Sequence, residues 1–257
     1  MLAKSAMSNP WLVWPRSNPN ARLRLFCFSY AGGSAAIYRH WPSKLQTDLE
    51  VVAIELPGRG NRIREEPFNR LPAVVQLTAR AIVPHLNKPY TFFGHSLGAL
   101  LSFEVARHLR RNYPHVPAPA HLFVSGRGAP QVDNGRYMIH NLPEAQLLTE
   151  VRRLNGTPPE VLADPELMEL VLPLLRADFA LCDTYVYEDD EPLVSPISAY
   201  GGLQDAEVSR AQLTEWGRQT SAAFRVSMFP GDHFFIHADE RLLLQTLARE
   251  LQEVIGR

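Results

Sequence analysis

Short apolar stretches alternate with amphipathic ones over the first half of the chain. Four of the apolar stretches carry few polar positions, as expected of strands buried on both faces: 22–29, 50–56, 90–93 and 121–126. Between them, apolar residues recur at helical spacing in 72–86 and after residue 96, and a further helix is expected at 37–45. Strands that alternate with helices predict parallel βαβ units with right-handed crossovers.

The alternation stops after residue 126 and resumes near residue 194. Residues 130–190 are helical by pattern and strand-free, and Pro173 is expected to kink the most apolar helix. The pattern then predicts strand, helix, strand and helix, in this order: 194–202, 209–220, 224–229 and 239–255. We therefore expect an α/β protein, a single domain of 257 residues with a mostly parallel central sheet flanked by helices and a helical insertion at about 130–190.

Composition and charge are those of a soluble globular protein. Hydrophobic residues make up 46% of the chain and charged residues 21%, and a net charge of −1 gives no field that favours nucleic acid or an anionic membrane. No apolar run approaches the ~18 residues of a membrane span, and residues 1–20 lack the apolar core of a signal peptide. Only two cysteines occur, Cys27 and Cys182, which favours a reducing compartment, the cytoplasm.

The most informative motif is "GHSLG" at residues 94–98, which matches G-x-S-x-G. A predicted strand leads into it and a predicted helix leaves it, and this is the setting in which such a serine is exposed as a nucleophile. The flanking glycines allow the sharp turn without a Cβ clash. The alternative is that Ser96 merely caps the helix. A nucleophilic role requires a base, an acid that orients the base, and donors for an oxyanion.

The base is expected in a loop after a late strand, because the chain order in this architecture is serine, acid, histidine. The sequence "FPGDHFFIH" follows the strand at 224–229 and contains His233 and His237. We favour His233, since a loop tip gives its imidazole a freer approach than the start of the last helix, where His237 is expected. The other reading of His233 is a hydrogen-bonded surface histidine.

Asp205 is the expected acid, because it follows the strand at 194–202 in a short loop at the same edge of the sheet. Asp232 is adjacent to His233, and neighbouring side chains rarely face each other in the required geometry. The remaining candidates fall in the insertion or at its exit: Asp178, Asp183, Asp189 and Asp190. The other reading of Asp205 is that it caps its own loop.

An oxyanion requires backbone N–H donors aimed at one point. One donor is expected from Leu97, directly after the serine. The other is expected from Ala31 in the turn "SYAGGSAA", where Gly32 and Gly33 let the backbone approach closely. This turn follows the strand at 22–29, so it reaches the same edge of the sheet.

Six segments distributed over nearly the whole chain carry a family resemblance: "FCFSYAGGSAAIYRHW", "IELPGRGNRIREEP", "FFGHSLGALLSFEVAR", "LFVSGRGAP", "LNGTPPEVL" and "GDHFFI". They resemble the type II thioesterases of polyketide and nonribosomal peptide synthesis, a branch of the α/β hydrolases. The resemblance implies an α/β-hydrolase fold in which Ser96, Asp205 and His233 form a catalytic triad, with Ala31 and Leu97 as oxyanion donors. The medium-chain thioesterase of animal fatty acid synthesis is the nearest rival.

The resemblance also implies a reaction. Such enzymes hydrolyse unwanted or stalled acyl groups from the phosphopantetheine thioesters of carrier proteins, through an acyl-serine intermediate and with no metal or organic cofactor. The insertion would be a lid over a channel for the acyl chain. The implied partner is an acyl or peptidyl carrier protein, with no nucleic acid and no membrane, and a monomer is expected. The family often has Pro and His or Phe before its Ala-Gly-Gly, where this chain has Ser29 and Tyr30.

Two peripheral features each have two readings. The apolar segment 166–185 either packs on the main domain or lines an acyl channel. Arg59, Arg62 and Arg64 either meet an acidic carrier protein or pair locally with glutamates in a solvated loop, and the second reading is favoured. Two other functions stay open: a carboxylesterase or lipase with the same triad, and a non-catalytic binding protein on this scaffold.

Overall fold

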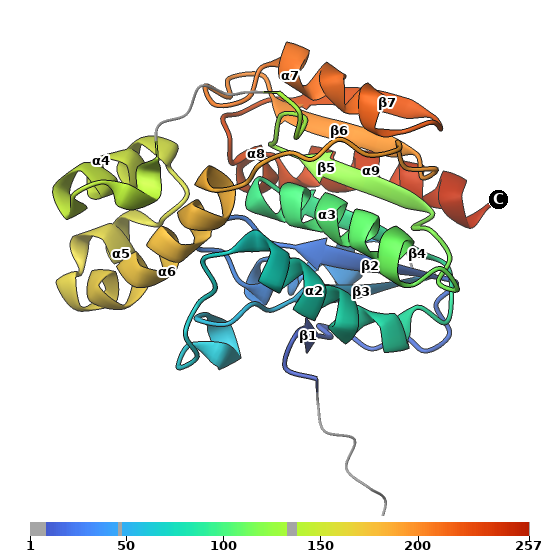
Figure 1. Cartoon of the computed structure of the whole chain (residues 1–257), viewed down its shortest axis with the longest axis horizontal. Coiled ribbons are helices and arrows are strands. Elements are labelled where there is room, and N and C mark those ends of the chain that lie inside the picture. Colours follow the sequence, from blue (N-terminus) through green and yellow to red (C-terminus); the bar gives the residue numbers. More distant parts are fainter. Residues whose placement is uncertain (1–8, 46–47, 133–137, 257) are drawn as a thin grey trace, which may run out of the picture.

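The computed structural model describes residues 9–45, 48–132 and 138–256, and it is built on one seven-stranded sheet (Figure 1). The strand order is β1-β3-β2-β4-β5-β6-β7, and every neighbouring pair is parallel except β1 and β3. The strands are β1 (Leu12–Val13), β2 (Leu23–Phe28), β3 (Leu49–Ile54), β4 (Tyr90–His95), β5 (His121–Ser125), β6 (Ile197–Gly202) and β7 (Phe224–Phe229). The predicted mostly parallel sheet is confirmed.

Helices cover both faces of the sheet (Figure 1). One face packs against α2 (Leu71–Ile82), α3 (Leu97–Asn112) and α7 (Arg210–Thr214). The other face packs against α1 (Trp41–Lys44), α8 (Phe235–Ala238) and α9 (Glu240–Ile255). Short 3-10 helices complete the main body: η1 (Ala35–Tyr38), η2 (Gly60–Arg62), η3 (Val83–His85) and η5 (Glu215–Gln219).

Side chains of β2 show how the sheet is buried on both sides. Phe26 and Phe28 belong to the core under α2 and α3, whereas Leu25 and Cys27 belong to the core under α9. Successive residues of a strand point to opposite faces, so a strand covered by helices on both faces has no polar alternation. This explains the apolar runs of the sequence and places Cys27 in the core as a small hydrophobe.

Two elements differ from the sequence prediction. The sequence did not predict β1, since two residues carry no periodicity. The helix expected at 37–45 is instead two short helices, η1 and α1, that are separated by a turn. Pro42 accounts for the division, because proline is tolerated only in the first turn of a helix, and it lies in the first turn of α1.

The chain between β5 and β6 forms a helical insertion at one end of the sheet (Figure 1). We use "the insertion" for residues 138–183, which contain four helices: η4 (Ile139–Asn141), α4 (Glu144–Leu154), α5 (Pro159–Ala163) and α6 (Pro165–Asp183). The expected insertion also included residues 133–137, which lie outside the described residues. The α6 helix continues through Pro173. Within the described ranges, no helix is long and apolar enough to cross a bilayer.

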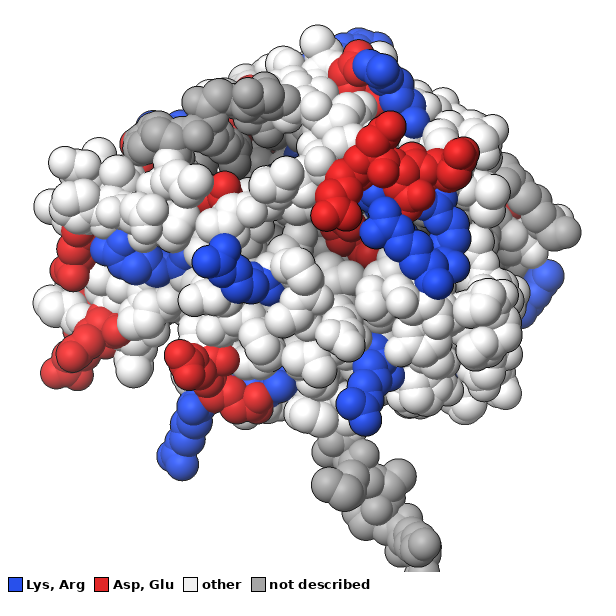
Figure 2. Space-filling view, viewed as in Figure 1, with Lys and Arg blue, Asp and Glu red and all other residues white. Residues whose placement is uncertain are grey.

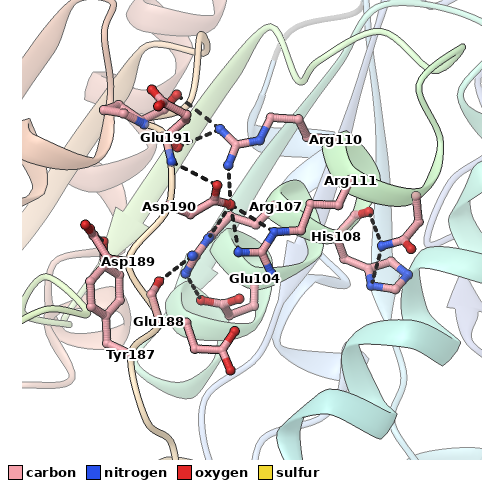
Figure 3. Close-up of polar contacts among 12 residues, drawn as sticks. Glu104, Arg107, His108, Arg110, Arg111, Tyr187, Glu188, Asp189, Asp190 and Glu191 are labelled. Carbon is pink, nitrogen blue, oxygen red and sulfur yellow. Dashed lines mark hydrogen bonds and ion pairs between the residues drawn. The ribbon is translucent and has the colours of Figure 1, made fainter.

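Charged side chains gather where the segment after the insertion crosses α3 (Figure 2). Three arginines of α3 converge on the carboxylate of Asp190 (Figure 3): Arg107, Arg110 and Arg111. Arg107 is buried and also donates a hydrogen bond to the backbone oxygen of Glu188. These basic residues therefore fix the segment after the insertion to α3, in addition to lying near the negative pole of the helix.

Candidate active site

Ser96 occupies a sharp turn between β4 and α3. Its backbone has φ 53° and ψ −112°, a conformation that a non-glycine residue keeps only when its surroundings enforce it. A Cβ on Gly94 would lie 2.1 Å from the Gly98 carbonyl oxygen, and one on Gly98 would lie 2.1 Å from the Phe28 carbonyl oxygen, so only glycine fits at either position. The Ser96 N–H donates to the Ser125 carbonyl oxygen at 2.7 Å. The Ser96 side chain makes no capping hydrogen bond, so the capping reading is wrong.

His233 and Asp205 meet between the loops that follow β7 and β6. Nδ1 of His233 lies 2.9 Å from Oδ2 of Asp205. The other carboxylate oxygen of Asp205 accepts the N–H groups of Glu207 at 2.7 Å and Val208 at 3.1 Å. Asp205 therefore caps its own loop and contacts the imidazole at the same time. Because Nδ1 is engaged, Nε2 is the nitrogen left to exchange a proton with a substrate or nucleophile.

The neighbouring alternatives are engaged elsewhere. The carboxylate of Asp232 accepts hydrogen bonds from the Asn155 side chain at 3.1 Å and from the Phe234 N–H at 2.8 Å. Nε2 of His237 lies 2.7 Å from the Tyr30 hydroxyl. His237 also lies in the separate helix α8 rather than at the start of the last helix, which corrects the sequence expectation. Neither side chain takes the place predicted for Asp205 or His233.

A second His–Asp pair lies within the insertion, where Nδ1 of His140 is 2.9 Å from Oδ2 of Asp183. A His–Asp contact alone is therefore not diagnostic. The two pairs differ in position, because His233 lines a cavity together with Ser96, whereas His140 and Asp183 do not line it. Across the part of the chain that the structure describes, no group of three or more His, Cys, Asp or Glu side chains could hold a metal ion.

The cavity that holds Ser96 and His233 is roofed by the insertion. From the main body its wall includes Tyr30, Ala31, Ser96, His233 and Phe234, and from the insertion Ile139, Val151, Leu154, Gly156, Thr157, Leu175, Phe179 and Cys182. Three residues of the apolar segment 166–185 thus line the cavity, and Leu181 of the same segment packs in the main core. The volume is about 50 Å³, far below the ~300–1,000 Å³ of pockets that hold drug-sized ligands. As it stands, the cavity is therefore small for an acyl chain.

The two expected oxyanion donors lie on either side of the serine turn. Ala31 lines the cavity, and its N–H donates to no other described residue. Leu97 is the first residue of α3, a position whose N–H has no partner within its own helix. Leu97 is fully buried and is not part of the cavity wall. Ala31 therefore lies in the wall of the cavity that holds Ser96, and Leu97 directly follows Ser96 in the chain.

Sequence reasoning missed a buried histidine beside the serine. Nδ1 of His95 lies 2.9 Å from the Ser125 hydroxyl, and its ring centroid lies 5.4 Å from that of His233. Burial lowers the pKa of His95 well below its ordinary value, and the charges of His233 and His237 lower it further. A Cβ on Gly126 would lie 2.6 Å from the ring. The sequence did carry one signal for this burial. His95 is the last residue of a strand that is covered on both faces, so its side chain must point into one of the two cores.

The comparisons with known proteins agree on one family. The model of the thioesterase domain family matches residues 23–253. The chain belongs to the thioesterase family. Gramicidin S biosynthesis protein GrsT of Aneurinibacillus migulanus is 44% identical over 96% of this chain and 96% of its own length. Linear gramicidin dehydrogenase LgrE of Brevibacillus parabrevis is 43% identical over 95% and 94%. The structure of the type II thioesterase BorB from the borrelidin biosynthetic cluster matches with a TM-score of 0.85 and 31% identity, over 94% of this chain and 97% of BorB. The predicted α/β-hydrolase fold and the resemblance to type II thioesterases are confirmed.

In this thioesterase, the arginine-rich loop bears out only part of its sequence readings. Arg59 and Arg62 are buried, and only Arg64 is exposed. Arg59 binds the carboxylate of Asp178 on α6 through two hydrogen bonds, at 2.9 and 2.7 Å. Arg62 pairs with Glu65, and its guanidinium also lies over the Trp11 ring. The expected local pair is present in a loop that is largely exposed, but Arg59 does not lie in solvent as expected. Burial removes Arg59 and Arg62 from any surface that could meet a partner.

Ser29 and Tyr30, which precede Ala31, differ from the residues that the family often has there, and each makes a specific contact. The hydroxyl of Ser29 donates to the Gly33 carbonyl oxygen at 3.0 Å, so it braces the glycine turn from inside. Tyr30 lines the cavity and contacts His237, and burial raises the pKa of Tyr30 to about 12. Tyr30 is therefore a neutral hydrogen-bonding group in the cavity wall at neutral pH.

Proposed function

We propose that this thioesterase hydrolyses aberrant or stalled acyl groups from the phosphopantetheine thioesters of carrier proteins in polyketide or nonribosomal peptide synthesis. The proposal rests on the cavity that Ser96 and the Asp205-bound His233 both line beneath the insertion. The relatives named for gramicidin and borrelidin biosynthesis support the pathway. LgrE is named a dehydrogenase, and that name applies to LgrE alone. The groups that this chain offers, a serine, an imidazole and N–H donors, are those that acyl transfer uses.

Acylation begins when Nε2 of His233 takes the hydroxyl proton of Ser96 as Oγ bonds to the thioester carbonyl carbon. The carbonyl oxygen becomes an oxyanion, which the N–H groups of Ala31 and Leu97 bind. The C–S bond then breaks, and the phosphopantetheine sulfur takes the proton from His233. Asp205 keeps the imidazole in the required tautomer and stabilises its cation.

Deacylation repeats these steps with water. Nε2 of His233 takes a proton from the attacking water, the same two N–H groups bind the second oxyanion, and the Ser96–acyl bond breaks as His233 returns the proton to Oγ. The products are a carboxylic acid and the free serine. Every proton is carried by His233, so the cycle needs no cofactor beyond the phosphopantetheine arm of the partner.

In this proposal the insertion is a lid on a single domain of 257 residues. Its apolar wall receives the acyl chain. The cavity is small and enlarges when the insertion shifts, so it accepts acyl groups of differing shape better than a fixed tunnel would. We therefore expect broad tolerance with a preference for short chains. A monomeric cytoplasmic enzyme acting on an acyl or peptidyl carrier protein completes the proposal.

The test is hydrolysis of a panel of acylated carrier proteins, followed by mass spectrometry of the carrier before and after treatment. We expect release of several short acyl groups, with the carrier thioester cleaved faster than an oxygen ester of the same acyl group. Ser96→Ala should lower the rate by about 10⁴-fold or more, because the residues of a triad act as a unit.

The rival functions give different results in the same experiment. Strict selection of one long chain would favour a fatty acyl thioesterase, and faster cleavage of the oxygen ester would favour a carboxylesterase. An unchanged rate in Ser96→Ala would contradict the proposal altogether.

A further inference from the structure

The turn that presents the Ala31 donor is held by groups that lie far away in the sequence. The Gly33 N–H donates to the Tyr30 carbonyl oxygen at 2.9 Å, which closes a four-residue turn, and Gly32 has φ 76° at its third position. This is the conformation of a type II turn. The closing hydrogen bond forms in type I and type II turns alike, and glycine adopts positive and negative φ about equally well, so neither one selects this orientation of the Ala31–Gly32 peptide.

Asp178 of α6 supplies the missing constraint. Its Oδ2 accepts the Gly32 N–H at 2.7 Å, and the carboxylate is fully buried. Arg59 binds both oxygens of the same carboxylate, and it also donates to the Gly33 carbonyl oxygen at 3.1 Å. The Gly32 N–H and the Gly33 carbonyl are therefore both held by one buried ion pair, which fixes the Ala31–Gly32 and Gly33–Ser34 peptide planes.

The same helix that carries Asp178 also roofs the cavity. Leu175, one turn earlier on α6, lines the cavity and packs so closely on the turn that a Cβ on Gly32 would lie 2.7 Å from its Cδ2 atom. Phe179, next to Asp178, lines the cavity too. A movement of α6 that enlarges the cavity therefore also acts on the hydrogen bond between Asp178 and Gly32.

We propose that Asp178, supported by Arg59, is a positioning residue for the oxyanion donor Ala31, so that the oxyanion site is complete only when α6 is seated on the turn. The inference rests on the proposed function, because it assigns Ala31 its role. Asp178 touches no reacting atom. It acts by holding the peptides that follow Ala31 against α6, and with them the turn that carries the Ala31 N–H.

The matched control is Asp183→Asn. Asp183 lies on α6 as well, is almost fully buried and pairs with His140, but it does not touch the turn. We expect Asp178→Asn to lower kcat about ten- to a hundredfold, less than the loss for deleting an oxyanion donor outright, with KM changed less than threefold. Affinity for a trifluoromethyl ketone analogue, which forms a tetrahedral oxyanion on Ser96, should fall by the same factor as kcat. Asp183→Asn should change neither quantity more than about threefold.

A second variant covers the case in which Asp178→Asn fails to fold, because it leaves the Arg59 charge buried and unpaired. Arg59→Met combined with Asp178→Leu removes both charges and keeps an apolar contact, a replacement that buried ion pairs often tolerate. We expect this double variant to melt near the wild-type temperature, to show faster hydrogen exchange at the Gly32 amide, and to have the lowered kcat.

The inference is overturned if a folded Asp178→Asn or the double variant keeps kcat within twofold of wild type, or if Asp183→Asn lowers kcat and analogue affinity equally. Failure of the proposed function is distinct from either result, since a wild-type protein that releases no acyl group, or an active Ser96→Ala, would show it before any position in α6 is changed.

Discussion

Ser96 shows how single residues position the chemistry proposed here. Its backbone conformation carries strain of order 1–3 kcal/mol, which the surrounding turn must offset. The glycines at 94 and 98 were predictable from the motif, since only a residue without Cβ allows the turn. His233 and Asp205 were predictable from chain order and loop position. His95 was not, because its burial depends on Gly126 and His233, which come close only in the folded chain.

At the residue scale, we predict acid sensitivity of the fold from His95. Its pKa in the folded protein lies well below the unfolded value near 6.5, so the unfolded chain binds the proton first as the pH falls. Stability should be fully present above about pH 6.5 and decrease below it, by about 1.4 kcal/mol per pH unit for each such histidine. His237 shifts in the same direction, because burial lowers its pKa.

The measurement is urea unfolding of wild type and His95→Asn between about pH 7 and pH 5, below the unfolded histidine pKa. Asparagine keeps a polar group where Nδ1 contacts the Ser125 hydroxyl, so the variant should fold and should show the smaller pH slope. His115→Asn, at an exposed position, is the control and should keep the wild-type slope. Equal slopes in all three proteins would refute the assignment.

At the scale of elements, α3 and α6 each bind loops that are distant in the sequence. The arginines of α3 bind the segment after the insertion, and Asp178 of α6 binds the loops that carry Gly32 and Arg59. Helical spacing predicted that both helices exist, and it predicted that the segment 166–185 was too apolar to face solvent. It did not predict the ion pair between Arg59 and Asp178, which are 119 positions apart in the sequence. Periodicity indicates which face of a helix or strand a residue occupies, and it does not indicate which residue it contacts. The solvated loop expected for Arg59 was wrong for this reason.

The cluster on Asp190 yields a prediction at this scale. Burial raises the pKa of Asp190, but the Glu191 N–H and the Arg110 guanidinium more than offset this and leave the pKa below its ordinary value. The ionised carboxylate is thus favoured by the fold, and its contribution is present at neutral pH and lost as the pH falls through the lowered folded pKa. We expect Asp190→Asn to lower the free energy of unfolding by about 1–3 kcal/mol at neutral pH, with kcat within about twofold.

Chemical denaturation at neutral pH measures this change. The exposed neighbour Asp189 is the control, and Asp189→Asn should change stability by less than about 0.5 kcal/mol. If Asp190→Asn were as stable as Asp189→Asn, the three arginines would not depend on Asp190, and the segment after the insertion would be held by other contacts.

For the whole molecule, alternating periodicity was sufficient to predict the parallel sheet, its flanking helices and an insertion before β6. It was insufficient for β1, which is too short to show a period, and for the two short helices in place of 37–45. The architecture brings Ala31, Ser96, Asp205 and His233 to one edge of the sheet, because the carboxyl ends of parallel strands lie together. The insertion then closes this edge and contacts both the Ala31 turn and the His233 loop.

The central claim is that Ser96 carries the acyl group during hydrolysis. The most direct measurement mixes the protein with an acylated carrier, quenches the reaction within the first turnover, and locates the acyl mass by peptide mass spectrometry. We predict that the acyl group is found on the peptide containing Ser96, and that Ser96→Ala shows neither the adduct nor the released acid. Release of the acid at the wild-type rate by Ser96→Ala, or an adduct on another residue that turns over at the rate of hydrolysis, would contradict the account.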